Sequence, residues 1–298
     1  MRRPHPSVLL QSAARRPDAE DRAAGTANLP AHRVVHGKGR PPMRIATWNV
    51  NSVRSRLPRI ADFLAAQQPD VLCMQETKVA DESFPAAEFE ALGYEVACAG
   101  AGGHSGVATA SRLPMTVVQR GFADEPAEVS RLLVTRIGRL PVVNTYVPQG
   151  KSADDPAFQG KLEFLARMRG FFDANWTPRA RVLWVGDLNV APEERDVHDP
   201  KRLARHPDFH PDARAAFAET VSWGFVDCFR QHNDEARQYT FYDYRDTKSI
   251  EKQHGWRVDH IMATRPLARR CTRAWIDMAP RLAEQPSDHT PLLAEFDV

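Results

Sequence analysis

The stretch Gln285-Pro286-Ser287-Asp288-His289 stands just before an apolar run, Pro291 to Phe296, near the end of the chain. It places a carboxylate and an imidazole side by side at the edge of a predicted strand. Four other stretches put polar side chains at the boundary of an apolar run in the same way. They are Trp48-Asn49-Val50-Asn51, Gln75-Glu76-Thr77-Lys78, Gly186-Asp187-Leu188-Asn189 and Arg257-Val258-Asp259-His260. Acidic and amide groups at the ends of five predicted strands indicate a hydrolytic metal site.

Each of these polar groups also has an ordinary structural explanation. A charge that ends a buried strand, as Glu76 does, is commonly a solvated residue. Asp187 or Asn189 can form an Asx turn after the preceding glycine, and Asp288 with His289 can cap a turn. Because all of these independent explanations would have to hold at once, the pattern favours one shared site.

The composition is that of a globular protein whose positive charge is local. The chain has 298 residues, of which 42% are hydrophobic, and this is enough for a sizeable core. Net charge is +2, but residues 1–42 carry +5 and the remainder carries −3. A body with this charge can bind nucleic acid only through a local patch. A cluster of carboxylates that holds a cation would help to explain the negative body.

The cysteines and the hydropathy pattern indicate a protein of a reducing compartment. The four cysteines are widely spaced and form no C-x-x-C pair, so we expect them to be reduced and mostly buried. No apolar run approaches the roughly 18 residues that span a bilayer, and the N-terminus lacks a signal-peptide core. We therefore expect a cytoplasmic protein that does not associate with membranes. The cysteines are Cys73, Cys98, Cys228 and Cys271.

Two regions of different character divide the chain. Residues 1–42 contain six prolines and no sustained periodicity, and they are predicted to be a disordered basic extension. Met43 opens the first convincing strand, and we expect it to be the native start. No Gly/Ser-rich or Pro-rich linker interrupts residues 43–298, which are predicted to form a single catalytic domain.

The hydrophobic pattern within residues 43–298 alternates between strand and helix periods. Amphipathic helices are predicted at 57–68, 160–176 and 212–223. Strands outnumber helices and often follow one another directly, which predicts two packed mixed sheets with helices outside, as one α/β domain. A Rossmann fold is disfavoured because no G-x-G-x-x-G follows the first strand. The predicted strands are 44–50, 71–74, 94–99, 106–110, 132–137, 142–147, 182–185, 258–263, 274–278 and 292–296, with a hairpin about Gly138-Arg139.

The donor types of the strand-end groups indicate which metal they would bind. Oxygen ligands without a Cys/His cluster favour a hard cation, Mg²⁺ or Mn²⁺, over zinc. Mg²⁺ usually takes one or two carboxylates, keeps several waters and binds a substrate phosphate. The set therefore suggests hydrolysis of a phosphodiester or a phosphomonoester.

The order of the motifs carries a resemblance to one family. From Met43 to the C-terminus the chain resembles the exonuclease III family of abasic-site DNA repair endonucleases, within the endonuclease/exonuclease/phosphatase superfamily. Any single motif is weak, but the ordered set is specific. Tyr146-Val147-Pro148-Gln149-Gly150 together with Gly255-Trp256-Arg257-Val258-Asp259-His260 narrows the resemblance to this family. The other motifs are Thr47 to Arg54, Gln75 to Lys78, Gly103 to Ala108, Gly186 to Asn189 and Pro286 to His289.

The resemblance implies a fold and an activity. The fold is a four-layered α/β sandwich of the DNase I type, with the site at one end of its two sheets. The activity is Mg²⁺-dependent cleavage of the phosphodiester 5′ to abasic sites, with Mn²⁺ as a substitute, in base excision repair. The same resemblance implies 3′-5′ exonuclease and 3′-phosphatase activity. The expected partner is double-stranded DNA with abasic sites or blocked 3′ ends, and the expected state is a monomer.

The resemblance also assigns the metal and the attacking water. Glu76 would be the main metal ligand, with Asn49 and Asp288 nearby. Asp187 and Asn189 would lie across the scissile phosphate, where a second metal would also bind if there is one. Asp187 would orient or deprotonate the attacking water, and Asn189 would hold that water or the phosphate.

Three further residues would act on the phosphate. His289 would donate to a phosphate oxygen and stabilise charge that develops in the transition state. Asp259 would fix the tautomer of His289 from behind. Tyr146 would contact the phosphate and help the leaving oxygen depart.

DNA contacts are implied at positions outside the metal site. Arg54, Lys78 and His104 would touch phosphates, which positions DNA without reading its sequence. Aromatic residues and Val258 would wall a pocket for an extruded abasic sugar, although on composition alone they could be simple core. These aromatic residues are Phe241, Tyr242 and Trp256. Arg245 would reach into the duplex.

Two other classes of function remain open on sequence grounds. One is a nonspecific nuclease, or a phosphoinositide or sphingomyelin phosphodiesterase, of the same superfamily. A lipid enzyme should carry a membrane-facing apolar or basic loop, and the sequence shows none. The other is a DNA-binding relative that has lost catalysis, which the complete set of polar site residues argues against.

Overall fold

The computed structural model describes residues 41–123 and 126–298. The predicted extension, residues 1–42, lies outside the described residues except for Pro41 and Pro42. The strands of the described part form two six-stranded sheets.

The first sheet has the order β11-β12-β1-β2-β4-β3. β1 and β2 are parallel, and the helix α1 (Val53–Gln67) connects them. All other neighbours in this sheet are antiparallel. The strands are β1 (Met43–Asn49), β2 (Val71–Gln75), β3 (Glu95–Ala99), β4 (Val107–Ser111), β11 (Cys271–Ile276) and β12 (Leu292–Phe296).

The second sheet has the order β5-β6-β7-β8-β10-β9. Here β7 and β8 form the parallel pair, and the long helix α3 (Pro156–Asn175) connects them. Each sheet thus has one parallel pair whose strands end at the same edge. The strands are β5 (Met115–Arg120), β6 (Leu132–Ile137), β7 (Leu140–Tyr146), β8 (Leu183–Asp187), β9 (Phe225–Asp227) and β10 (Asp259–Thr264).

The two sheets pack face to face through a mainly apolar interior. Ile45 and Val71 of the first sheet share a buried cluster with Val142 and Val185 of the second. A polar link crosses the same interface, because the side chain of Gln75 donates to Asn144 Oδ1 at 2.8 Å. The amide of Asn144 in turn donates to two backbone carbonyls of the first sheet, at Met74 and Ala108. These hydrogen bonds of Asn144 fix how the two sheets sit on each other, because a buried polar group requires a hydrogen-bond partner.

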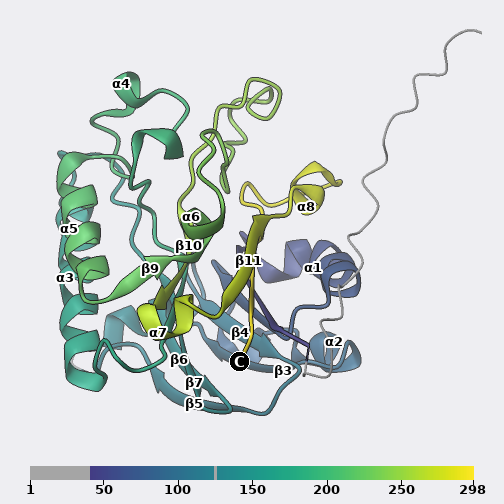
Figure 1. Ribbon diagram of the computed structural model, residues 1–298. Coiled ribbons are helices and arrows are strands. Elements are labelled where there is room, and N and C mark those ends of the chain that lie inside the picture. Colours follow the sequence, from purple (N-terminus) through teal and green to yellow (C-terminus); the bar gives the residue numbers. More distant parts are fainter. Residues whose placement is uncertain (1–40, 124–125) are drawn as a thin grey trace, which may run out of the picture. The chain divides into compact units, whose positions relative to one another are not determined.

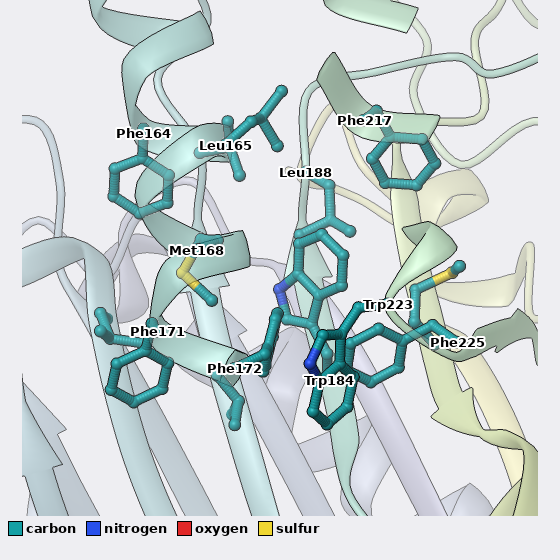
Figure 2. Close-up of a cluster of buried hydrophobic side chains, with 14 of the residues drawn as sticks. Phe164, Leu165, Met168, Phe171, Phe172, Trp184, Leu188, Phe217, Trp223 and Phe225 are labelled. Atoms are coloured by element: carbon teal, nitrogen blue, oxygen red, sulfur yellow. The ribbon is translucent and has the colours of Figure 1, made fainter. Parts of the chain in front are cut away.

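Helices cover the outer face of each sheet, so the predicted four-layered sandwich is confirmed (Figure 1). α1 and α2 (Ala86–Ala91) cover the first sheet, and α3 and α5 (Pro211–Ser222) lie side by side on the second. Figure 2 shows the aromatic cluster beneath α3, where Phe172 of α3 meets Trp184 of β8 with ring centroids 5.4 Å apart. The short helices are α4 (Pro200–Leu203), α6 (Cys228–His232), α7 (Arg265–Ala268) and α8 (Ala279–Leu282).

Element boundaries differ from the sequence prediction where the apolar pattern is weak. β5 was not predicted, because it is a sheet edge on which partly buried and exposed residues alternate. α1 begins at Val53 rather than at residue 57, since its first turn is polar and is capped by the Ser52 side chain. β11 begins three residues before the predicted 274, where exposed Thr272 and Arg273 hide the strand.

The cysteines and the helices bear on the predicted character of the chain. All four cysteines are free, and three of them are buried, as predicted. Within residues 41–123 and 126–298, no helix has the length and apolar character needed to cross a membrane.

Candidate active site

The candidate site lies where the two parallel strand pairs end. In the first sheet Asn49 is opposite Gln75 at the ends of β1 and β2, and Glu76 follows directly. In the second, Asp187 at the end of β8 pairs with Tyr146 of β7 on one side and with Asp259 of β10 on the other. Because the sheets pack face to face, these strand ends bring the predicted residues together.

One amide group links the carboxylates of the two sheets. Asn49 Nδ2 donates to Glu76 Oε1 at 2.8 Å and to Asp187 Oδ2 at 2.9 Å. Lys78 Nζ lies 2.9 Å from the other oxygen of Glu76. Burial acts to raise the pKa of Glu76, but the hydrogen bonds from Asn49 and Lys78 outweigh it, so this pKa lies below its usual value. Glu76 is therefore an ionised carboxylate, ready to bind a cation.

Asp187 is in the opposite electrostatic situation. It is buried, and this burial raises its pKa well above the ordinary value; the nearby Asp259 adds to the effect, while His289 opposes it. Even beside His289, the ionised form of Asp187 is thus disfavoured until a further positive charge, such as a metal cation, comes near. A carboxylate of this kind can accept a proton or help to hold a cation.

A buried Asp–His pair faces Asp187. His289 Nδ1 lies 2.8 Å from Asp259 Oδ2, and His289 Nε2 lies 3.8 Å from Asp187 Oδ2. Burial acts to lower the pKa of His289, but the two carboxylates outweigh it and raise this pKa to about 10. His289 is accordingly an imidazolium at neutral pH, with one nitrogen held by Asp259 and the other directed toward the site.

The donor atoms fit a hard cation. The ligand atoms of Asp187, Asp259 and His289 lie within 4.8 Å of one another. Because the protonated ring of His289 has no free lone pair, only the two carboxylates of this trio suit a cation. Further oxygen donors line the cavity that Asp187 and His289 border: Asn51, Glu76, Asn189 and Asp288. In the described part of the chain, Asp259 Oδ1 is buried and lacks a hydrogen-bond partner. A mainly oxygen donor set is the one that Mg²⁺, Ca²⁺ or Mn²⁺ prefers.

Asp288 joins the site through a residue that was not predicted to act there. Asn51 Nδ2 donates to Asp288 Oδ1 at 2.9 Å, and Asn51 Oδ1 accepts from Lys78 Nζ at 2.6 Å. Lys78 thus connects two carboxylates, one directly and one through Asn51. Asn51 belongs to the stretch Trp48-Asn49-Val50-Asn51, but the position of Asn51 in the sequence does not indicate its contacts with Asp288 and Lys78.

The backbone of the site is strained. Asn51, Glu76, Lys78 and Asn189 all have positive φ values, of 45°, 49°, 57° and 48°. None of them is glycine, and such conformations persist only where many surrounding contacts determine them. Their concentration at one place is typical of a functional site, because the strain positions the side chains.

Asn189 and Tyr146 present defined atoms to the cavity. Asn189 Nδ2 donates to Val147 O at 2.9 Å, which leaves its Oδ1 as an acceptor. Burial, together with Glu76 and Asp187, raises the pKa of Tyr146 well above 10. The Tyr146 phenol is therefore neutral at ordinary pH and can donate a hydrogen bond.

The cavity at this site has a volume of about 380 Å³. It brings together ten residues that were predicted from sequence for metal binding, catalysis or DNA contact: Glu76, Lys78, Tyr146, Asp187, Asn189, Phe241, Arg245, Val258, Asp288 and His289. Asn49 and Asp259 support them from behind. Residues to which no role was assigned complete the lining; they lie on loops without apolar periodicity, although Asn51 and Gln149 belong to motifs quoted from the sequence. These are Asn51, Gln149, Asp208, Asp243 and Tyr244.

Some predicted DNA contacts lie outside this cavity. Trp256 lines a neighbouring cavity of about 280 Å³ instead, which shares Phe241 and Arg245 with the first. Tyr242 is buried against Tyr239 and lines neither cavity. The exposed residues Arg54 on α1 and His104 in a turn also lie outside both cavities. Arg245 is 91% exposed and is paired with Asp243 at 2.6 Å.

The chain is similar to known nucleases in sequence and in structure. Residues 46–289 match the Endonuclease/Exonuclease/phosphatase family. Exodeoxyribonuclease III of Haemophilus influenzae is 34% identical over 267 residues, which is 85% of this chain and 100% of the relative. An AP endonuclease structure from Archaeoglobus fulgidus has 47% identity and a TM-score of 0.84, over 86% of this chain and 100% of that one. A Neisseria 3′ phosphatase bound to a product DNA hairpin has 32% identity and a TM-score of 0.82 over the same shares.

Proposed function

Because the chain belongs to the endonuclease/exonuclease/phosphatase family, we propose that it is a metal-dependent DNA repair nuclease of the exonuclease III type. It hydrolyses the phosphodiester 5′ to an abasic site and removes blocking groups from 3′ ends by the same chemistry. The observation that carries this proposal is the Asn49 amide that joins Glu76 to Asp187, with the His289–Asp259 pair facing them. This arrangement places acceptor groups on one side of the cavity and the His289 imidazolium on the other.

Mg²⁺ is the proposed metal, with Mn²⁺ as a substitute. Glu76 and Asp288 would hold it, with Asn49 nearby, because these groups offer hard oxygen donors. Asp187 and Asn189 would border a second ion if one binds. A bound cation supplies neutralisation of phosphate charge and lowers the pKa of a bound water.

The residues that face the proposed metal position accept the proton of the water and stabilise the charge that develops on the phosphate. Asp187, whose pKa is raised by burial, accepts the proton of the attacking water, and Asn189 Oδ1 orients that water. His289 donates from Nε2 to a phosphate oxygen, and this stabilises charge that develops in the transition state. Tyr146 donates from its neutral phenol to the phosphate or to the leaving oxygen.

The substrate is double-stranded DNA, bound by a monomer. Phe241 and Trp256 wall the second cavity, next to the carboxylates, and we propose that this cavity accepts the extruded abasic sugar. A sugar without a base flips out cheaply, because no base pair must be broken. Lys78 at the cavity, with Arg54 and His104 outside it, would bind phosphates. Arg245 would reach into the duplex.

The proposed function is tested with two duplexes that differ at one position. One carries a single synthetic abasic site, and the other carries an intact nucleotide there. We expect cleavage at the abasic site in Mg²⁺ and little internal cleavage of the intact duplex. Equal internal cleavage of both would identify a nonspecific nuclease, and binding without cleavage would identify an inactive relative.

The Asp259–His289 hydrogen bond gives a specific prediction. Asp259→Asn should lower kcat by about 10- to 100-fold, the usual cost of losing a partner that orients a catalytic ligand. The effect should nearly vanish in a His289→Ala background, because Asp259 acts through His289. The double-mutant cycle is measured with saturating abasic duplex. Additive effects would show that Asp259 acts independently of His289.

Trp256 gives a prediction about substrate choice. Trp256→Ala should lower kcat/KM for the abasic duplex more than for a 3′-phosphate end, because the second reaction needs the phosphate site without full sugar extrusion. Both reactions are compared in one buffer, since phosphate contacts make each salt-dependent. Trp275→Ala is the matched control, because Trp275 is also partly buried but lines neither cavity. Equal losses on both substrates would make Trp256 a core support.

A further inference from the structure

A lysine that is completely buried lies beneath the site cavity. Lys161, near the start of α3, has an exposed fraction of 0%. Its three N–H groups are shared among four oxygens: Gln149 O at 3.1 Å, Pro207 O at 3.1 Å, Asp208 Oδ1 at 2.8 Å and Asn189 O. Lysine is rarely fully buried unless it is paired, and here the pairing partner is Asp208.

The four acceptors of Lys161 come from three separate loops. Gln149 lies on the loop after β7, Asn189 on the loop after β8, and Pro207 with Asp208 on the loop before α5. Gln149, Asn189 and Asp208 all line the site cavity. One ammonium group therefore joins three parts of the cavity wall from underneath, without facing the cavity itself.

The contact with Asn189 has a particular consequence. Asn189 has a φ of 48°, a strained conformation for a residue other than glycine. Three contacts determine it: the backbone N–H donates to Asp187 Oδ1 at 3.1 Å, the side chain donates to Val147 O, and the carbonyl accepts from Lys161. Lys161 thus holds the carbonyl of Asn189, whereas the other two contacts hold its backbone N–H and its side chain.

We propose that Lys161 is a positioning residue for cleavage, and this rests on the role proposed for Asn189. Its ammonium holds the carbonyl of Asn189, which keeps the Asn189 amide directed at the attacking water. The same charge balances Asp208, whose carboxylate would otherwise face DNA phosphates across the cavity. Lys161 does not touch the substrate.

The test uses Lys161→Met, which keeps the length of the side chain and removes its charge and donors. We expect kcat on the abasic duplex to fall about 10- to 100-fold, as when a partner of a catalytic group is lost. In an Asn189→Ala background the same substitution should cost less than about threefold, since the group it positions is already absent. Loss of stability with unchanged kcat, or an equal cost in both backgrounds, would overturn the proposal.

Two further variants separate positioning from folding. Lys161→Met with Asp208→Asn removes both charges of this buried pair, so this protein should fold even if the single variant does not; its kcat should still be low. Arg44→Met is the control, because Arg44 also joins a carboxylate and a backbone carbonyl, Glu295 and Gln67, away from the cavity. Arg44→Met should lower the melting temperature and leave kcat unchanged.

A readout that is independent of activity distinguishes this proposal from the proposed function. The crystal structure of the Lys161→Met variant should show the Asn189 backbone outside the left-handed region. If the wild-type protein does not cleave the abasic duplex, the proposed function fails, and this structure alone decides the role of Lys161. An unchanged Asn189 conformation would contradict it.

Discussion

Glu76→Ala is expected to abolish cleavage of an abasic duplex in Mg²⁺, with a loss of at least about three orders of magnitude, the upper range for one preorganised group. Glu76 is an ionised carboxylate held by Asn49 and Lys78 at the end of β2, so it is the group best prepared to bind the cation. The rate is measured under single-turnover conditions. Retained activity at low Mg²⁺ would exclude Glu76 as a ligand.

Glu295→Ala provides a matched control for this loss. Glu295 is also a strand carboxylate in a partly buried ion pair, with Arg44 at 2.7 Å, and its side chain is 13% exposed against 17% for Glu76. Glu295 lies outside the cavity. Glu295→Ala should therefore keep its turnover and lose at least as much thermal stability as Glu76→Ala.

Asp187→Asn is expected to lower kcat by about 10²–10⁴-fold, the contribution typical of a general base. DNA binding should be nearly unchanged, because asparagine keeps the shape of the side chain and can still accept one of the two hydrogen bonds that Asp187 accepts, from Asn49 Nδ2 and from the Asn189 backbone N–H. Without metal, the variant should melt at a higher temperature than the wild type at neutral pH. The raised pKa of Asp187 means that folding at neutral pH must either bury its charge or take up a proton, and asparagine avoids this cost.

Kinetics and melting together decide the role of Asp187. A change confined to KM would show that Asp187 binds substrate and does not act in the chemical step. A large fall in melting temperature would show that the ionised carboxylate supports the fold.

The sequence was most informative where polar residues stand at the ends of predicted strands. Glu76, Asp187 and His289 were predicted because each stands at the boundary of an apolar run, and the parallel pairs β1/β2 and β7/β8 bring these boundaries to one place. The four-layered architecture was predicted from the same pattern together with the family resemblance. Such predictions succeed because buried strands have a simple apolar signature.

The supporting residues could not be predicted in this way. Lys161 lies on an amphipathic helix, where a lysine is normally expected to face solvent, and only the fold shows that it is buried. Asp208 and Gln149 lie on loops whose course depends on tertiary contacts. The position of Trp256, in a second cavity beside the carboxylates, likewise depends on how its loop packs against Phe241.

The most direct test of the account is a product analysis on one labelled duplex with a single abasic site. The protein is first treated with a chelator, and Mg²⁺ is then restored. We predict no cleavage in the chelator and, with Mg²⁺, a product with a 3′-hydroxyl end on the 5′ side of the abasic sugar. Cleavage that persists in the chelator, or a 3′ end that still carries a sugar remnant as elimination leaves, would contradict metal-dependent hydrolysis at this site.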